Sequence, residues 1–92
     1  MPDREQTTLN RMESGQSGKV VQIQGGYGLI NRLGALGIRH GKRISKVSSM
    51  FMRGPVTIQV GNAQVAIGFG MAEKIIVELG ESRNGMPQRG KK

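Results

Sequence analysis

Charged residues in the middle of the chain are the first candidates for binding chemistry. Between residues 32 and 53 the sequence contains bases and no acid, namely Arg32, Arg39, Lys42, Arg43, Lys46 and Arg53. Clustered like charge raises the rate and the selectivity of association with a surface of opposite charge. The stretch therefore predicts docking to an acidic protein surface, an anionic lipid or RNA, and its alternative is an ordinary solvated face.

Three apolar residues interrupt this basic stretch where a loop between two strands is expected. Met50, Phe51 and Met52 follow two serines and precede Arg53. Loop tips are usually polar, and methionine adapts its shape to different partners. We interpret the tip as an anchor for a partner or a self-association contact; alternatively, the loop folds back and caps the open end of the fold.

Metal and catalytic chemistry are poorly supported by the composition. An iron(II) site commonly needs two histidines and a carboxylate, and this chain has one histidine, His40, six carboxylates and no cysteine. Asp3, Glu5 and Glu81 fall in the expected flexible ends. We therefore predict no metal ligands, no cofactor and no catalytic residues, and we expect His40 to be an exposed turn residue.

Nucleotide binding through a phosphate loop is also excluded by the sequence. Such a loop needs a glycine-lysine pair followed by serine or threonine, because the hydroxyl reaches the magnesium ion. Lys42 is followed by Arg43, and Lys19 by Val20.

Length and charge limit the chain to one small domain. Its 92 residues carry a net charge of +8, and a chain of this size buries only roughly 60% of its unfolded surface, enough for one modest core. No stretch is long and apolar enough for a membrane span or a secretory signal, so we expect a cytoplasmic protein. We predict a flexible N-terminus over residues 1–7, a domain over 8–79 and a disordered basic C-terminal tail over 80–92.

The spacing of apolar residues predicts the elements that must position these side chains. Alternation indicates five strands, over residues 19–24, 42–48, 56–60, 64–68 and 75–79, and Gly61-Asn62 predicts a hairpin between the third and the fourth. Ile44 and Val47 are out of phase, which indicates a bulge or a sharp bend. Residues 29–36 have helical spacing, and single helical turns are expected over 8–13 and 70–74. The prediction is a mainly β fold, a small five-stranded SH3-like barrel with one short helix inserted after the first strand; an OB-like barrel is the alternative.

Several motifs in this order resemble the FeoA family, small cytosolic accessory proteins of bacterial ferrous-iron transport. The similar segments are Gly15-Gln16-Ser17-Gly18, residues 32–41 (RLGALGIRHG), Gly54-Pro55-Val56-Thr57-Ile58 and Ala72-Glu73-Lys74-Ile75-Ile76-Val77. The resemblance implies an SH3-like barrel that acts with the membrane permease FeoB, which carries its own GTP-binding domain. A similar barrel also forms the C-terminal module of iron-dependent and manganese-dependent repressors.

We therefore expect a non-enzymatic regulatory subunit that binds the cytosolic part of a FeoB-like permease. It is expected to be peripheral to the membrane only through this partner. No specific nucleic acid is expected, and weak self-association is allowed for. The expected contact residues are Arg32, Arg39, Lys42, Arg43, Lys46, Met50, Phe51, Met52 and Arg53. The alternatives are a small basic barrel that binds RNA and a module that senses a divalent metal.

Overall fold

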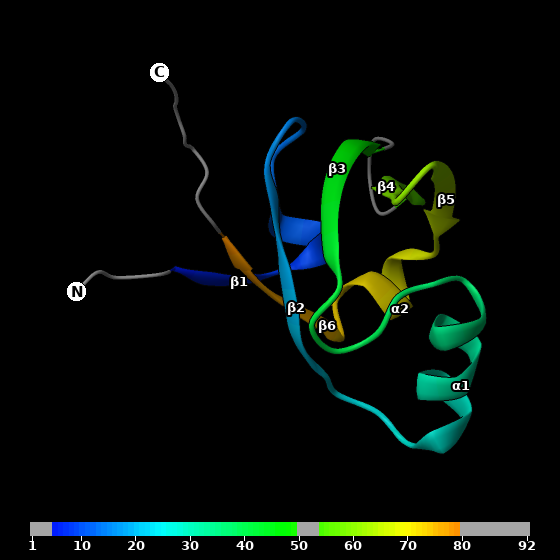
Figure 1. Ribbon diagram of the computed structural model, residues 1–92. Helices are drawn as coiled ribbons and strands as arrows, with labels where there is room; N and C mark the ends of the chain where they lie inside the picture. The colour runs from blue at the N-terminus through cyan, green and yellow to red at the C-terminus, as the bar shows by residue number, and fades with distance from the viewer. Residues whose placement is uncertain (1–4, 50–53, 80–92) are drawn as a thin grey trace.

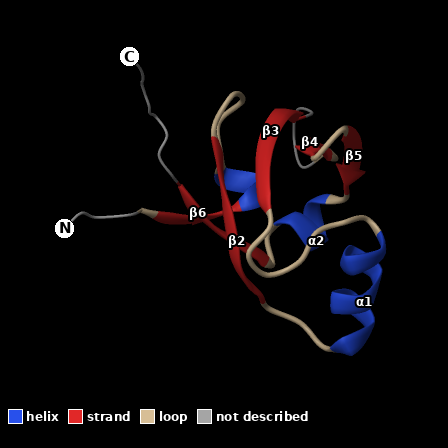
Figure 2. Ribbon diagram, viewed as in Figure 1, coloured by secondary structure: helices blue, strands red, loops and turns tan. Residues whose placement is uncertain are grey.

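The computed structural model describes residues 5–49 and 54–79 of the chain. Figure 1 and Figure 2 show a twisted sheet with one longer helix, α1, beside it. The strands are β1 (Gln6–Thr8), β2 (Ser17–Ile23), β3 (Arg43–Ser49), β4 (Val56–Val60), β5 (Ala63–Ile67) and β6 (Ile75–Leu79). The helices are η1 (Leu9–Arg11), a 3-10 turn, α1 (Tyr27–Ala35) and α2 (Phe69–Ala72).

The six described strands form one sheet in the order β1-β6-β2-β3-β4-β5, and every neighbouring pair is antiparallel. The last strand, β6, lies between the first two. Within the described residues β1 and β5 are edge strands that do not pair with each other, so the sheet is unclosed. The mainly β, roughly SH3-like fold is confirmed, but the strand number is six rather than five and the predicted barrel closure is not found.

The additional strand comes from a segment that the sequence analysis assigned to a flexible end and a helical turn. Gln6 and Thr7 pair with Glu78 and Val77 of β6, and the Leu79 amide donates to the Glu5 carbonyl at 2.8 Å. Part of the segment that the sequence analysis expected to be flexible is thus paired in the sheet. This polar strand has no apolar alternation to reveal it; it is held by backbone pairing and by Leu9 and Met12, buried just after it.

The bulge predicted in β3 is confirmed. The register of β3 against β4 shifts between Lys46 and Ser48, so Val47 is an extra residue that is 39% exposed. Ile44 is buried and Val47 is exposed, as residues three apart are in a regular strand. The bulge changes the pairing of the residues that follow, so that Ser49 lies opposite Val56.

The hairpin predicted around Gly61 and Asn62 is also confirmed. Val60 lies opposite Ala63, and the pairing runs without a shift to Val56 and Ile67. Gly61 has a φ of +60°, the left-handed conformation that a tight hairpin turn needs.

Helix α1 is anchored by its C-terminal end. Leu33 and Ile38 are fully buried, and the Ile38 amide donates to the Leu33 carbonyl at 2.9 Å. The helix ends before Gly37, whose φ is +90°. A Cβ added to Gly34 would meet nothing within 4 Å, so no neighbouring backbone requires a glycine there. Tertiary contacts through Leu33 and Ile38 therefore stabilise a helix that Gly34 weakens.

The core is a single aliphatic cluster enclosed by the sheet, α1, η1 and α2. Its buried members are Leu9, Met12, Val20, Leu33, Ile38, Ile44, Val56, Ile58, Val60, Ile67, Ala72, Ile75 and Val77.

Candidate functional site

Four exposed bases gather where β2 meets the start of β3. Lys19 on β2 lies opposite Arg43 on β3, and Arg39 and Lys42 belong to the connection that leads into β3. We call Lys19, Arg39, Lys42 and Arg43 the basic surface. Sequence reasoning missed Lys19, because it lies well before residues 32–53 in the chain and only the pairing of β2 with β3 brings it to Arg43.

Backbone bonds fix the connection that carries the basic surface. The Val20 amide donates to the Lys42 carbonyl at 2.9 Å, and the Gly41 amide donates to the Val20 carbonyl at 2.7 Å. Gly41 has a φ of +89°, a conformation that side chains rarely adopt. The Arg39 guanidinium donates to the Gly34 carbonyl at 3.1 Å. An ordered turn thus presents Arg39 and Lys42. Glu78 of β6 lies opposite Lys19, at the border of the basic surface.

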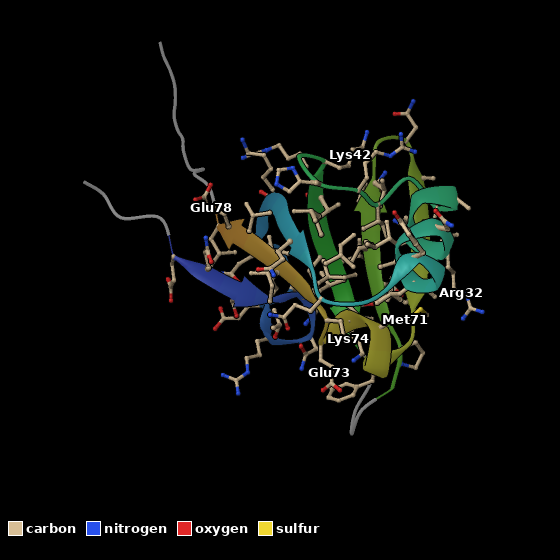
Figure 3. The ribbon with its side chains drawn as sticks, turned by 90° about the horizontal axis from the view of Figure 1, so that it is seen from below. Arg32, Lys42, Met71, Glu73, Lys74 and Glu78 are labelled. Carbon is tan, nitrogen blue, oxygen red and sulfur yellow. The ribbon has the colours of Figure 1, made fainter. Side chains whose placement is uncertain are left out.

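Arg32 does not join the basic surface. It is exposed in the last turn of α1, and Figure 3 shows it pointing away from Lys42 on a different side of the molecule. The predicted continuous basic stretch is therefore divided by the fold.

Lys46 lies inside the molecule, and the expectation that it is a surface base is wrong. Its side chain is 3% exposed, and its ammonium nitrogen donates to the main-chain oxygens of Asn10, at 3.1 Å, and Met12. Burial lowers the pKa of the Lys46 amine because desolvation disfavours the charged form. Lys46 lies two residues after Ile44 in a regular part of β3, so strand alternation places both on the core side.

A polar groove that the sequence analysis did not anticipate lies near this buried lysine. It has a volume of about 920 Å³, and Asn10, Arg11, Phe69 and Glu73 contribute to its walls. The Asn10 Oδ1 atom is buried without a hydrogen-bond partner. The residues that line the groove come from β1, η1, α2 and β6. These elements lie at the two ends of the described sequence, so no local motif indicates the groove.

A second, apolar groove of about 610 Å³ lies between the start of α1 and α2. Leu29 and Met71 line it together with four glycines, and Glu73 and Lys74 form part of its rim. Figure 3 shows Met71, Glu73 and Lys74 on the side of the molecule away from Lys42. The only sequence feature that indicates this groove is its glycines, one pair before α1 and one pair flanking Phe69.

The remaining predicted contact residues, Met50, Phe51, Met52 and Arg53, lie outside the described residues. His40 is exposed in the turn before β3. Among residues 5–49 and 54–79, no three His, Cys, Asp or Glu side chains come close enough to hold a metal ion. No helix in this part of the chain is long and apolar enough to cross a membrane.

Comparison with known proteins gives a consistent set of relatives. A family model described as FeoA domain matches residues 7–79. A protein of Methanocaldococcus jannaschii named "Putative Fe(2+) transport protein A" is 35% identical over 69 residues, which cover 75% of this chain and 82% of that protein.

Solved structures with the same fold include a protein described as an iron uptake regulatory protein, FeoA. It superposes with a TM-score of 0.75 at 35% identity, covering 82% of this chain and 97% of that one. A manganese-dependent transcriptional repressor reaches the same TM-score at 20% identity, covering 86% of this chain and 44% of the repressor. This second likeness concerns the fold alone.

Proposed function

The chain belongs to the FeoA family, and from this premise we propose that it is a non-enzymatic, cytoplasmic accessory subunit of ferrous-iron transport that binds the cytosolic part of a FeoB-like permease. The observation that carries the proposal is the basic surface formed by Lys19, Arg39, Lys42 and Arg43. It consists of exposed side chains on β2, on the start of β3 and on the ordered turn before β3, and none of them lines either groove.

Electrostatic docking is the chemistry that such a surface performs best. Charges on a rim accelerate encounter and select partners, while contributing less to final affinity than a buried anchor does. We assign the anchor to Met50, Phe51 and Met52 and include Arg53, which follows them, in the contact. Arg32, on a different side of the molecule, lies outside it. The proposed partner face is acidic and contains an apolar recess for the anchor.

The test is binding between the full chain and the GTP-binding domain of the permease, measured by calorimetry with and without nucleotide. We expect K42E/R43E to weaken binding about tenfold or more, because it replaces attraction with repulsion at the centre of the surface. The matched control is R11E/K74E, which changes the net charge equally at exposed positions outside the basic surface. Equal weakening by both variants, or no binding by the wild-type chain in any nucleotide state, would overturn the proposal.

The anchor is tested separately by F51S/M52S, which leaves the charge unchanged. We expect a faster dissociation rate with little change in the association rate, because apolar anchors act mainly on the lifetime of a complex. An unchanged dissociation rate would remove these residues from the contact.

RNA binding is the alternative function for the same basic residues. It predicts affinity for single-stranded RNA that falls steeply with salt and depends on Arg39, Lys42 and Arg43. The exposed aromatic residue of the described part, Tyr27, lies on α1 and not on the basic surface, so no tyrosine or phenylalanine of this part offers a stacking platform beside these bases. We therefore favour the protein partner.

A further inference from the structure

We propose that two copies of this chain associate through the outer edge of β5, pairing antiparallel about a two-fold axis that passes beside Val65. This inference concerns a different surface from the basic one and does not depend on the permease as a partner. It rests on the position of β5 in the sheet, on the direction of its backbone groups and on the residues that it carries.

Strand β5 ends the sheet of the described residues, and its own sequence carries none of the usual protection of an edge strand. It pairs with β4 on one side, and in the described part of the chain no strand pairs with its other side. Natural edge strands are usually short, charged, bulged or interrupted by proline, because a regular free edge recruits other strands. The opposite edge strand, β1, has only three residues. By contrast, β5 has five residues, with no charge, no proline and no register shift.

The hairpin geometry decides which backbone groups face outward. A two-residue loop places its flanking residues, Val60 and Ala63, in a pair that exchanges both backbone bonds, and such pairs alternate along antiparallel strands. Ala63, Val65 and Ile67 therefore direct their amide and carbonyl groups toward β4. The amide and carbonyl groups of Gln64 and Ala66 point away from it, to the free edge.

These outward groups are complementary to a second copy of themselves. With the axis beside Val65, Gln64 of one copy lies opposite Ala66 of the other, and each of the two resulting pairs forms two hydrogen bonds. Val65 then faces its own counterpart in a non-hydrogen-bonded pair, where side chains come closest. Val65 is half-buried in one copy, so the contact would cover the part that remains exposed and join the two cores at their edges.

Charge does not oppose a second copy at this edge, although each copy carries a net charge of +8. No residue of β5 is charged, so pairing brings no like charges opposite each other at the contact itself. The repulsion that remains comes from the rest of each molecule and is screened by salt. Association through β5 should therefore strengthen as salt is added, whereas docking of the basic surface to an acidic partner should weaken.

The experiment is sedimentation velocity of the full chain over a wide concentration range, at low and at high salt. We expect a reversible monomer–dimer equilibrium that shifts toward the dimer at higher salt. Amide hydrogen exchange gives an independent readout: the Gln64 and Ala66 amides should exchange more slowly as the protein concentration rises, while the Val65 amide should not change. A wild-type chain that stays monomeric at every concentration would overturn the proposal.

The decisive variant is Ala66→Pro. Its amide points away from β4, so proline removes two of the four interchain bonds without removing a bond of the β4–β5 hairpin. We expect the dissociation constant of the dimer to rise about tenfold or more. Ala66→Ser keeps the amide and is the matched control that should dimerise normally. Ala66→Lys, which leaves the backbone intact and adds an exposed charge at the edge, should also weaken the dimer and replaces the proline variant if that one fails to fold.

Two further outcomes would contradict the proposal. Equal dimerisation of wild type, Ala66→Pro and Ala66→Lys would place the contact elsewhere. A monomeric wild type whose binding to the permease domain is weakened by Ala66→Pro would show that the edge receives a strand of another protein instead of a second copy.

Discussion

The ammonium nitrogen of Lys46 lies 3.1 Å from the main-chain oxygen of Asn10, 36 residues earlier in the chain, and also donates to the main-chain oxygen of Met12. It therefore joins β3 to the segment that follows β1. The backbone supports the same junction, because the Gly15 amide donates to the Lys46 carbonyl and the Lys46 amide donates to the Gln16 carbonyl, both at 2.8 Å.

Removing this ammonium group should destabilise the fold. In Lys46→Met the side chain stays apolar and of similar length, but the carbonyl oxygens of Asn10 and Met12 lose their donor. We expect the free energy of unfolding to fall by about 1–3 kcal/mol, the usual cost of leaving buried polar groups unpaired. Urea denaturation measures it, with the exposed Lys42→Met as control, expected within about 0.5 kcal/mol of wild type. A Lys46→Met protein as stable as wild type would show that these bonds contribute nothing net.

Lys46 should also make stability depend on alkaline pH. Burial lowers the pKa of its amine in the folded state below the ordinary value of 10.5, which we take for the unfolded chain. Between the folded and the unfolded pKa the unfolded chain binds more protons, so the free energy of unfolding rises with pH across that window. The difference in unfolding free energy between wild type and Lys46→Met should therefore increase as pH approaches 10.5. A difference that stays constant from pH 7 to 10.5 would contradict the expected shift.

Two glycines at the end of α1 should respond to alanine in opposite directions. Gly34 lies within the helix, and a Cβ there meets nothing within 4 Å, so Gly34→Ala should stabilise the protein by about 0.5–1 kcal/mol. Gly37 has a φ of +90° and a Cβ there would lie 3.2 Å from Val60 Cγ1, so Gly37→Ala should destabilise it by about 1–2 kcal/mol. Thermal denaturation of both variants gives the signs. A stability change of the same sign in both variants would show that helix propensity and backbone strain do not determine stability at the end of α1.

Gly18 marks a close approach between β2 and β6. A Cβ on Gly18 would lie 2.5 Å from the Glu78 carbonyl oxygen and 2.6 Å from Val77 Cγ1, so Gly18→Ala must push the two strands apart. We expect a loss of about 1–3 kcal/mol in unfolding free energy. Gln22→Ala, an exposed position on the same strand, is the control and should change stability by less than about 0.5 kcal/mol. A tolerated Gly18→Ala would mean that β6 can shift without loss.

Regular elements were predictable because their apolar spacing is local information. Strands β4, β5 and β6, helix α1 and the bulge in β3 each have a period or a break of period that can be read over a few residues. Strand β1 has no such signal, because its polar residues are held by pairing with a strand almost seventy residues later. The closure of the sheet depends on pairings of this kind, which is why the predicted barrel differs from the sheet that is found.

The candidate site was predictable in part for the same reason. Arg39, Lys42 and Arg43 follow one another closely in the sequence, and all three are exposed in the structure. Lys19 joins them only through strand pairing. Lys46 is separated from them because it shares the core face of β3 with Ile44. Two carbonyl oxygens compensate its buried ammonium, a partnership that residue types alone do not indicate.

The position of β6 between β1 and β2 also determines when the molecule can be completed during synthesis. A chain that has emerged only as far as β5 holds its first two strands with no strand between them, so β1 has no partner and the Gly18 side of β2 is open. Residues 75–79 supply both missing pairings at once. The sheet is therefore completed by β6. A chain released before residue 79 would leave the ribosome with the facing edges of β1 and β2 unpaired.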